Sequence, residues 1–240
     1  MSSSPDIQPY TLSPYNVGAY VANGRIVYPG PQRTKVAIWG FGCQSRHDVP
    51  FDRADFVIWS INNAWNASRD SQGRLRADTW WEMHNIAPDA DGKYAGRPIQ
   101  NENDMTWIRS CPVPLFTVEP FDTNPLAVVW PLDYYARKFR DYFTCTFAYQ
   151  IATAIDWGFE EIHLFGLQLL LGTKREATVE SSCVNYWLGL AEGKGVKVVV
   201  PPDDQFLLGH GGLHYGADYW SEASFVLDYI RRWDTMREAV

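Results

Sequence analysis

Helix-like and strand-like segments alternate between residues 144 and 200, and this alternation constrains the fold more than any other feature of the chain. Phe147, Ile151 and Ala154 lie on one helical face, and Gly158 follows as a residue that commonly ends a helix. Helices that alternate with strands are typical of parallel sheets, because each helix returns the chain to the same end of the sheet. The expected order is helix, strand, helix and strand, over residues 144–157, 161–166, 181–192 and 196–200.

Four apolar runs extend this pattern toward the N-terminus, and a further amphipathic helix is expected at 221–236. In one run, Pro114 indicates an irregular or edge position, because proline has no N–H to donate to a sheet. Together these elements predict a Rossmann-like α/β fold with an open, mostly parallel sheet of about six strands and helices on both faces. The four runs span residues 36–40, 55–61, 79–84 and 113–117.

The first 34 residues differ in composition from the remainder of the chain, being rich in Pro, Gly and Ser. We interpret 1–34 as an arm and 35–240 as a single Rossmann-like domain. Within the arm, Asn23-Gly24 lies between two short apolar runs, 19–22 and 25–28. This dipeptide favours a type I′ turn and therefore predicts a short hairpin.

Charge and cysteine spacing exclude several function classes. The net charge of −7 and a pI near 5.2 argue against a broad nucleic-acid surface. No apolar run approaches the roughly 20 residues of a membrane span, and no targeting signal is visible. The four cysteines form no C-x-x-C pair, so we expect reduced thiols, a cytoplasmic protein and no metal site. The sequence does not determine the oligomeric state, and both a monomer and an oligomer are compatible with it.

Polar or small residues follow the first three expected strands, where parallel sheets bind ligands. Gly40 and Gly42 form a Gly-x-Gly turn that either presents N–H groups to a phosphate or is a plain tight turn. Asn62 and Asn63 either bind a base or ribose or cap the next helix. His84 is either a general base or a structural histidine.

Hydroxyl and basic side chains stand near the later elements. Thr144 and Thr146, at an expected helix start, either cap the helix or bind an anion. Lys174 and Arg175 lie just beyond a strand end and are the best-placed pair for a phosphate.

Acidic and histidine side chains supply the remaining candidates. Glu176 and Glu180, four residues apart, share a face if helical, and could do acid or base chemistry or form a solvated helix start. His214, in the glycine-rich segment 208–216, is a poor metal ligand without an acidic neighbour, and the segment is expected to be a lid over a ligand.

Short motifs over residues 35–200 resemble the bacterial sialyltransferases of glycosyltransferase family 42 and the related hydroxymethylpterin pyrophosphokinase-like proteins. The resemblance implies a nucleotide-binding Rossmann-like fold and group transfer. Phe41 stands where the family has Asn, and Gln168 where it has Asp, so CMP-sugar specificity does not carry over. The family's histidine base has no counterpart after the fifth strand, so Glu176 or Glu180 would replace it. The matching motifs are Gly40-Phe-Gly42, Ile61-Asn62-Asn63, Thr144-Cys-Thr146 and Leu164-Phe-Gly166.

Two functions remain open from the sequence. The first is a group transferase that uses a nucleotide-linked donor, such as a nucleotide sugar, with Glu180, Glu176 or His84 as base. The second is a non-catalytic nucleotide-binding module, or a protein-interaction module whose N-terminal arm binds a partner. A nicotinamide oxidoreductase is disfavoured, because the third fingerprint glycine and an acidic ribose ligand are missing. The small isolated domain also resembles proteins of tailed phages. The cofactor stays unidentified.

Overall fold

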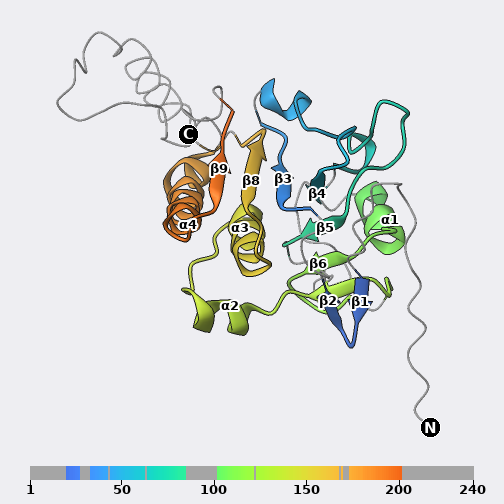
Figure 1. Cartoon of the computed structure of the whole chain (residues 1–240). Helices are drawn as coiled ribbons and strands as arrows, with labels where there is room; N and C mark the ends of the chain where they lie inside the picture. The colour runs from blue at the N-terminus through green and yellow to red at the C-terminus, as the bar shows by residue number, and fades with distance from the viewer. Residues whose placement is uncertain are drawn as a thin grey trace, which may run out of the picture.

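Seven parallel strands form the central sheet of the described residues, in the order β7-β6-β5-β4-β3-β8-β9 (Figure 1). The computed structural model describes residues 20–27, 33–42, 44–62, 64–84, 102–121, 123–167, 169 and 173–201. The strands are β3 (Lys35–Trp39), β4 (Phe56–Ile61), β5 (Thr79–Glu82), β6 (Leu115–Thr117), β7 (Ala127–Val129), β8 (Glu161–Phe165) and β9 (Lys197–Val199). This confirms the predicted open, mostly parallel α/β sheet.

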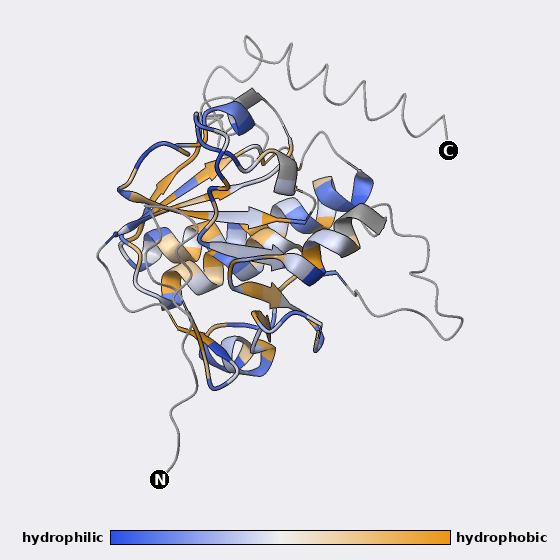
Figure 2. Cartoon of the chain, turned by 90° about the vertical axis from the view of Figure 1, so that its right-hand side faces the viewer, coloured by the Kyte–Doolittle hydropathy of each residue, from blue (hydrophilic) through white to orange (hydrophobic). Residues whose placement is uncertain are grey.

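Helices cover both faces of this sheet, as expected. Helices α3 (Thr146–Asp156) and α4 (Ser181–Gly193) pack on one face, and α1 (Glu102–Ser110) packs on the other. Alternate residues of β3 serve the two cores: Val36 and Ile38 face α3 and α4, whereas Ala37 and Trp39 face α1. Because both faces are covered, the strands are apolar nearly throughout, and Figure 2 shows apolar residues concentrated along them.

One strand of the sheet and two α-helices were not expected from the sequence. Strand β7 has only three residues, and α1 and α2 (Leu132–Lys138) are short and weakly patterned. The strand expected at 113–117 begins only at Leu115, after Pro114, whose carbonyl accepts the Trp80 N–H. Pro114 therefore precedes the strand and does not make β6 an edge strand, because β6 lies between β5 and β7.

The predicted hairpin is present at the start of the described chain. Strands β1 (Tyr20–Ala22) and β2 (Arg25–Val27) pair antiparallel. Asn23 and Gly24 have φ angles of 51° and 68°, and a type I′ turn needs positive φ at both positions. Ile26 is buried against the core that contains α3 and α4. The division into an arm at 1–34 and a domain at 35–240 stays a prediction, and the helix expected at 221–236 lies outside the described residues.

Gly40 and Gly166 bring the loops after β3 and β8 into direct backbone contact. The Gly40 N–H donates to the Phe165 carbonyl, and the Gly42 N–H donates to the Gly166 carbonyl, both at 2.8 Å. A Cβ added at Gly166, which has φ of +69°, would lie 2.4 Å from the Gly40 carbonyl oxygen. Only glycine fits this contact.

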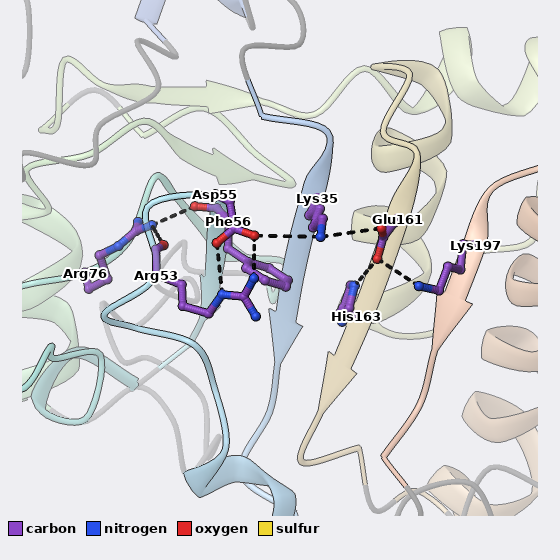
Figure 3. A network of polar contacts seen from close by, with 8 residues as sticks. All are labelled: Lys35, Arg53, Asp55, Phe56, Arg76, Glu161, His163 and Lys197. Carbon is purple, nitrogen blue, oxygen red and sulfur yellow. Dashed lines mark hydrogen bonds and ion pairs between the residues drawn. The ribbon is translucent and has the colours of Figure 1, made fainter.

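Charged side chains from neighbouring strands meet at the opposite, amino-terminal edge of the sheet (Figure 3). Lys35 Nζ lies 3.7 Å from Asp55 and 3.6 Å from Glu161. Glu161 also binds His163 Nε2 at 2.7 Å and Lys197 Nζ at 3.3 Å. The network therefore joins β3, β8 and β9 to the residue that precedes β4.

Gly166→Ala is expected to destabilise the fold far more than Gly158→Ala. Both positions have positive φ, but nothing lies within 4 Å of a Cβ added at Gly158. Conformational strain alone costs about 1–2 kcal/mol, and overpacking at Gly166 adds about 1–3 kcal/mol. Denaturant unfolding measures both variants, and equal losses of stability would contradict the role assigned to the Gly40 contact.

Acidification is expected to weaken the network through Glu161. The hydrogen bond from His163, followed by the contacts with Lys197 and Lys35, holds the pKa of Glu161 below its ordinary value. Such a carboxylate stabilises the fold above the unfolded pKa of about 4.3, and its contribution disappears as the pH falls through the lower, folded value. On acidification below a pH of about 4.3, the melting temperature of Glu161→Gln should therefore fall less than that of the wild type. Thermal melts against pH test this, and an unchanged acid loss would contradict it.

Candidate functional site

A cleft of about 730 Å³ lies where β3, β4, β5 and β8 end. The chain runs outward from β3 through β4 to β7 on one side, then returns to place β8 on the other side of β3. The cleft thus lies at the topological switch point, where open parallel sheets bind ligands. Its lining includes Phe41, Asn62, Met83, His84, Phe143, Tyr149, Leu169 and Arg175.

The fold brings eight of the sequence-predicted site residues together around this cleft. Two others, Gly40 and Lys174, are not among its lining residues, and Lys174 is exposed. Asn63 and His214 lie outside the described residues. The eight lining residues are Gly42, Asn62, His84, Thr144, Thr146, Arg175, Glu176 and Glu180.

The Gly-x-Gly turn contributes shape to the cleft. The Gly40 N–H donates to the carbonyl of Phe165, the last residue of β8, and the Gly42 N–H donates to the carbonyl of Gly166, the residue that follows it. These two N–H groups are therefore already paired within the protein. Of the two alternatives, the structure favours the tight turn, with Gly42 lining the cleft by its backbone.

Asn62 is held in a strained backbone conformation at the end of β4. Its φ angle is +45°, a region that asparagine enters more readily than most residues. Its N–H donates to the Trp81 carbonyl, and its carbonyl accepts from Trp80 Nε1, both at 3.0 Å. Its side-chain Oδ1 is buried and has no hydrogen-bond partner in the described part of the chain. An unpaired buried acceptor beside a cleft can receive a donor from a ligand.

His84 lines the cleft and contacts a buried carboxylate. Glu82 Oε1 lies 2.6 Å from His84 Nδ1 and accepts the His84 backbone N–H at 3.1 Å. The Glu82 side chain is 2% exposed, whereas that of His84 is 37% exposed. Sequence reasoning did not select Glu82. The available signal was a carboxylate in an otherwise apolar strand, two residues before a histidine.

Arg175 and Glu180 form an ion pair on the facing wall. Arg175 Nε donates to Glu180 Oε1 at 3.0 Å, and the Arg175 side chain is 67% exposed. Burial raises the pKa of Glu180 above its ordinary value, although the hydrogen bond from Arg175 opposes the shift. This side of the cleft therefore carries the exposed guanidinium of Arg175 and the more buried carboxyl group of Glu180.

Glu176 caps the N-terminus of the helix in which it lies. Helical backbone begins at Lys174, and Thr173 and Glu176 bond reciprocally: Glu176 Oε2 accepts the Thr173 N–H, and the Glu176 N–H donates to Thr173 Oγ1. This is a capping box. Glu176 and Glu180 lie in the π-helical segment η3 (Glu176–Glu180) and both line the cleft. The capping contact favours a structural role for Glu176 over a role as base.

Thr144 connects the η3 segment to the start of α3. Thr144 Oγ1 donates to the Val179 carbonyl at 3.4 Å, and the Thr144 carbonyl accepts from Arg175 at 3.3 Å. Thr146 is the first residue of α3 and is buried. Thr144 therefore helps to hold η3 against the entry to α3.

Aromatic rings form much of the remaining cleft wall. Phe41 is 38% exposed and packs on Trp39 with ring centroids 5.3 Å apart. Arg46 donates to the Phe41 carbonyl at 2.9 Å, which holds the turn in place. Phe143 and Tyr149 lie together with centroids 5.0 Å apart. Flat apolar faces beside polar groups suit a ligand with a planar ring.

The described residues contain no group of three potential metal ligands and no helix long and apolar enough to cross a membrane.

Comparison with known proteins gives one group of similar structures. No protein-family model and no curated protein sequence matches the chain. A sialyltransferase CST-II structure in complex with CMP has a TM-score of 0.48 and 15% identity, covering 74% of this chain and 85% of that chain. For the monofunctional alpha-2,3-sialyltransferase Cst-I from Campylobacter jejuni, the TM-score is 0.40 and the identity 11%, covering 88% and 97%.

A further similar structure is CstII from Campylobacter jejuni with cytidine-5'-monophosphate, with a TM-score of 0.42 and 15% identity over 70% of this chain and 79% of that chain. These solved structures are sialyltransferases. At such identities no substrate and no residue role carries over to this chain. The resemblance to tailed-phage proteins gains no support, and the resemblance to pterin pyrophosphokinase-like proteins stays a prediction.

Proposed function

We propose that this chain is a group transferase that binds a nucleotide-linked donor, such as a nucleotide sugar, in the cleft and passes the group to an acceptor hydroxyl. One observation carries the proposal: residues that follow four neighbouring strands converge at the switch point with a histidine, a guanidinium and an exposed aromatic face. The cleft volume of about 730 Å³ fits the range of ligand sites.

Donor binding uses three kinds of group. Phe41 offers a flat face on which a nucleobase stacks. The unpaired Oδ1 of Asn62 accepts a hydrogen bond from the base or ribose. The exposed guanidinium of Arg175 neutralises phosphate oxygens, and Lys174, also exposed, adds positive charge outside the cleft.

His84 is the base in this proposal. Glu176 is engaged in helix capping, and Glu180 is paired with Arg175. The acceptor hydroxyl gives its proton to the His84 imidazole, and its oxygen forms a bond to the transferred carbon. The bond from that carbon to the donor phosphate breaks, and the nucleotide leaves with the electron pair, its charge facing Arg175.

His84→Asn is expected to abolish most turnover. The assay follows nucleotide release from CMP-, UDP- and GDP-linked sugars, with and without simple sugar acceptors. One donor family should be consumed, and His84→Asn should lower kcat about 10²- to 10⁴-fold, the usual contribution of a general base. His163→Asn, at the opposite edge of the sheet, is the matched control and should keep wild-type kcat. Glu176→Gln should also remain active, because glutamine serves a capping box.

Each contrary outcome has a definite meaning. Full activity in His84→Asn would show that His84 is not the base and would favour Glu180 in that role. Saturable nucleotide binding without release from any donor would contradict the transferase proposal and favour the non-catalytic nucleotide-binding module.

Phe41→Ala is expected to weaken nucleotide binding about 5- to 150-fold, since stacking of one base on an aromatic ring contributes about 1–3 kcal/mol. Phe41→Tyr preserves the ring face and should bind like the wild type. Titration calorimetry with the free nucleotide of the active donor measures both. Equal affinity of Phe41→Ala and wild type would exclude Phe41 as the stacking surface.

A further inference from the structure

Glu82 places a carboxylate in the buried part of the sheet, beside Thr117 of the neighbouring strand β6. It ends β5 and is 1% exposed. In the described part of the chain it forms no ion pair with a lysine or arginine, and the titratable side chain that it contacts is His84. A buried carboxylate without a cationic partner is costly, so its position calls for a compensating role.

The geometry of the pair determines where the histidine proton lies. One oxygen, Glu82 Oε1, lies 2.6 Å from His84 Nδ1 and 3.1 Å from the His84 backbone nitrogen. A carboxylate oxygen only accepts, so Nδ1 carries the hydrogen and Nε2 of the neutral ring keeps its lone pair. The second contact fixes the backbone of the same residue, so that ring and main chain are held together.

We propose that Glu82 is a positioning residue that holds His84 in the Nδ1–H tautomer, with Nε2 as the atom that takes a proton from a ligand hydroxyl in the cleft. The catalytic consequence rests on the proposed function, whereas the tautomer does not. When Nε2 takes the proton, the resulting imidazolium faces the Glu82 carboxylate, which stabilises the new charge without moving.

A second Glu-x-His pair in the same sheet lies away from the cleft and serves as a comparison for Glu82 and His84. Glu161 and His163 have the same spacing but lie at the amino-terminal edge (Figure 3). There Nε2 is the engaged nitrogen, at 2.7 Å from Glu161 Oε2, and the ring stands edge-on to Phe56 with centroids 4.8 Å apart. Glu161 is also neutralised by Lys35 and Lys197. Among the described residues no lysine pairs with Glu82, and His84 lines the cleft.

Nitrogen-15 NMR of the ligand-free protein tests the tautomer directly. At about pH 8, above the ordinary histidine range, the His84 ring should show a protonated Nδ1 and an unprotonated Nε2, with His84→Asn used to assign the signals. Glu82→Met removes the acceptor and should lose the preference for Nδ1–H. Glu82→Gln should keep it, because the His84 backbone N–H selects the amide oxygen at the Oε1 position.

Kinetics test the catalytic consequence with the same variants. Glu82→Met should lower kcat at least about 10²-fold, the smallest usual contribution of a positioned base, with KM little changed. Glu82→Gln should fall between Glu82→Met and wild type, because it keeps the tautomer but lacks the charge. Glu161→Gln is the matched control and should keep wild-type kcat.

The outcomes separate the two proposals. A wild-type spectrum with Nε2 protonated overturns the positioning role, even if Glu82→Met fails to fold. An Nδ1–H tautomer that persists in folded Glu82→Met overturns it as well. The expected spectra in a protein that consumes no donor would support the positioning role and reject the transferase function.

Discussion

Gly40 and Gly166 hold the loops after β3 and β8 in backbone contact, and the cleft depends on that contact. The sheet reverses its winding direction here, so the loops on either side diverge and leave room for a ligand. A side chain at either glycine would meet backbone of the facing loop, and at Gly40 also the Phe147 ring. In the same contact the Gly42 N–H donates to the Gly166 carbonyl. The turn therefore shapes the site, while side chains from neighbouring strands supply its chemistry.

The two edges of the sheet use charged residues in opposite ways. At the amino-terminal edge, the charge of Glu161 is balanced by its ion pairs with Lys35 and Lys197. These ion pairs join adjacent strands. At the carboxyl-terminal edge, Glu82 is buried beside His84, and Asn62 keeps an unpaired oxygen. An unpaired buried oxygen lowers stability, and because Asn62 lines the cleft, a ligand there can supply the partner that Oδ1 lacks in the described residues.

Much of the sheet was predictable because its strands are buried on both faces and read as apolar runs. Six of the seven strands, and helices α3 and α4, appear close to their expected bounds. The short strand β7 and the helices α1 and α2 were missed, because three to nine weakly patterned residues give no clear periodicity. For the site, the rule that ligands bind at strand ends selected eight residues that the fold does gather around one cleft.

The sequence by itself determined the order of six strands of the sheet and of helices α3 and α4, the hairpin at Asn23-Gly24 and the polar residues at strand ends, since these depend on local periodicity and turn chemistry. Only the tertiary structure decided which of those residues have partners. It paired the Gly42 amide with the Gly166 carbonyl, engaged Glu176 in a helix cap and placed Glu82 against His84. Hydrogen-bond partners depend on distances and directions set by packing, and a periodic pattern of residue types does not contain them.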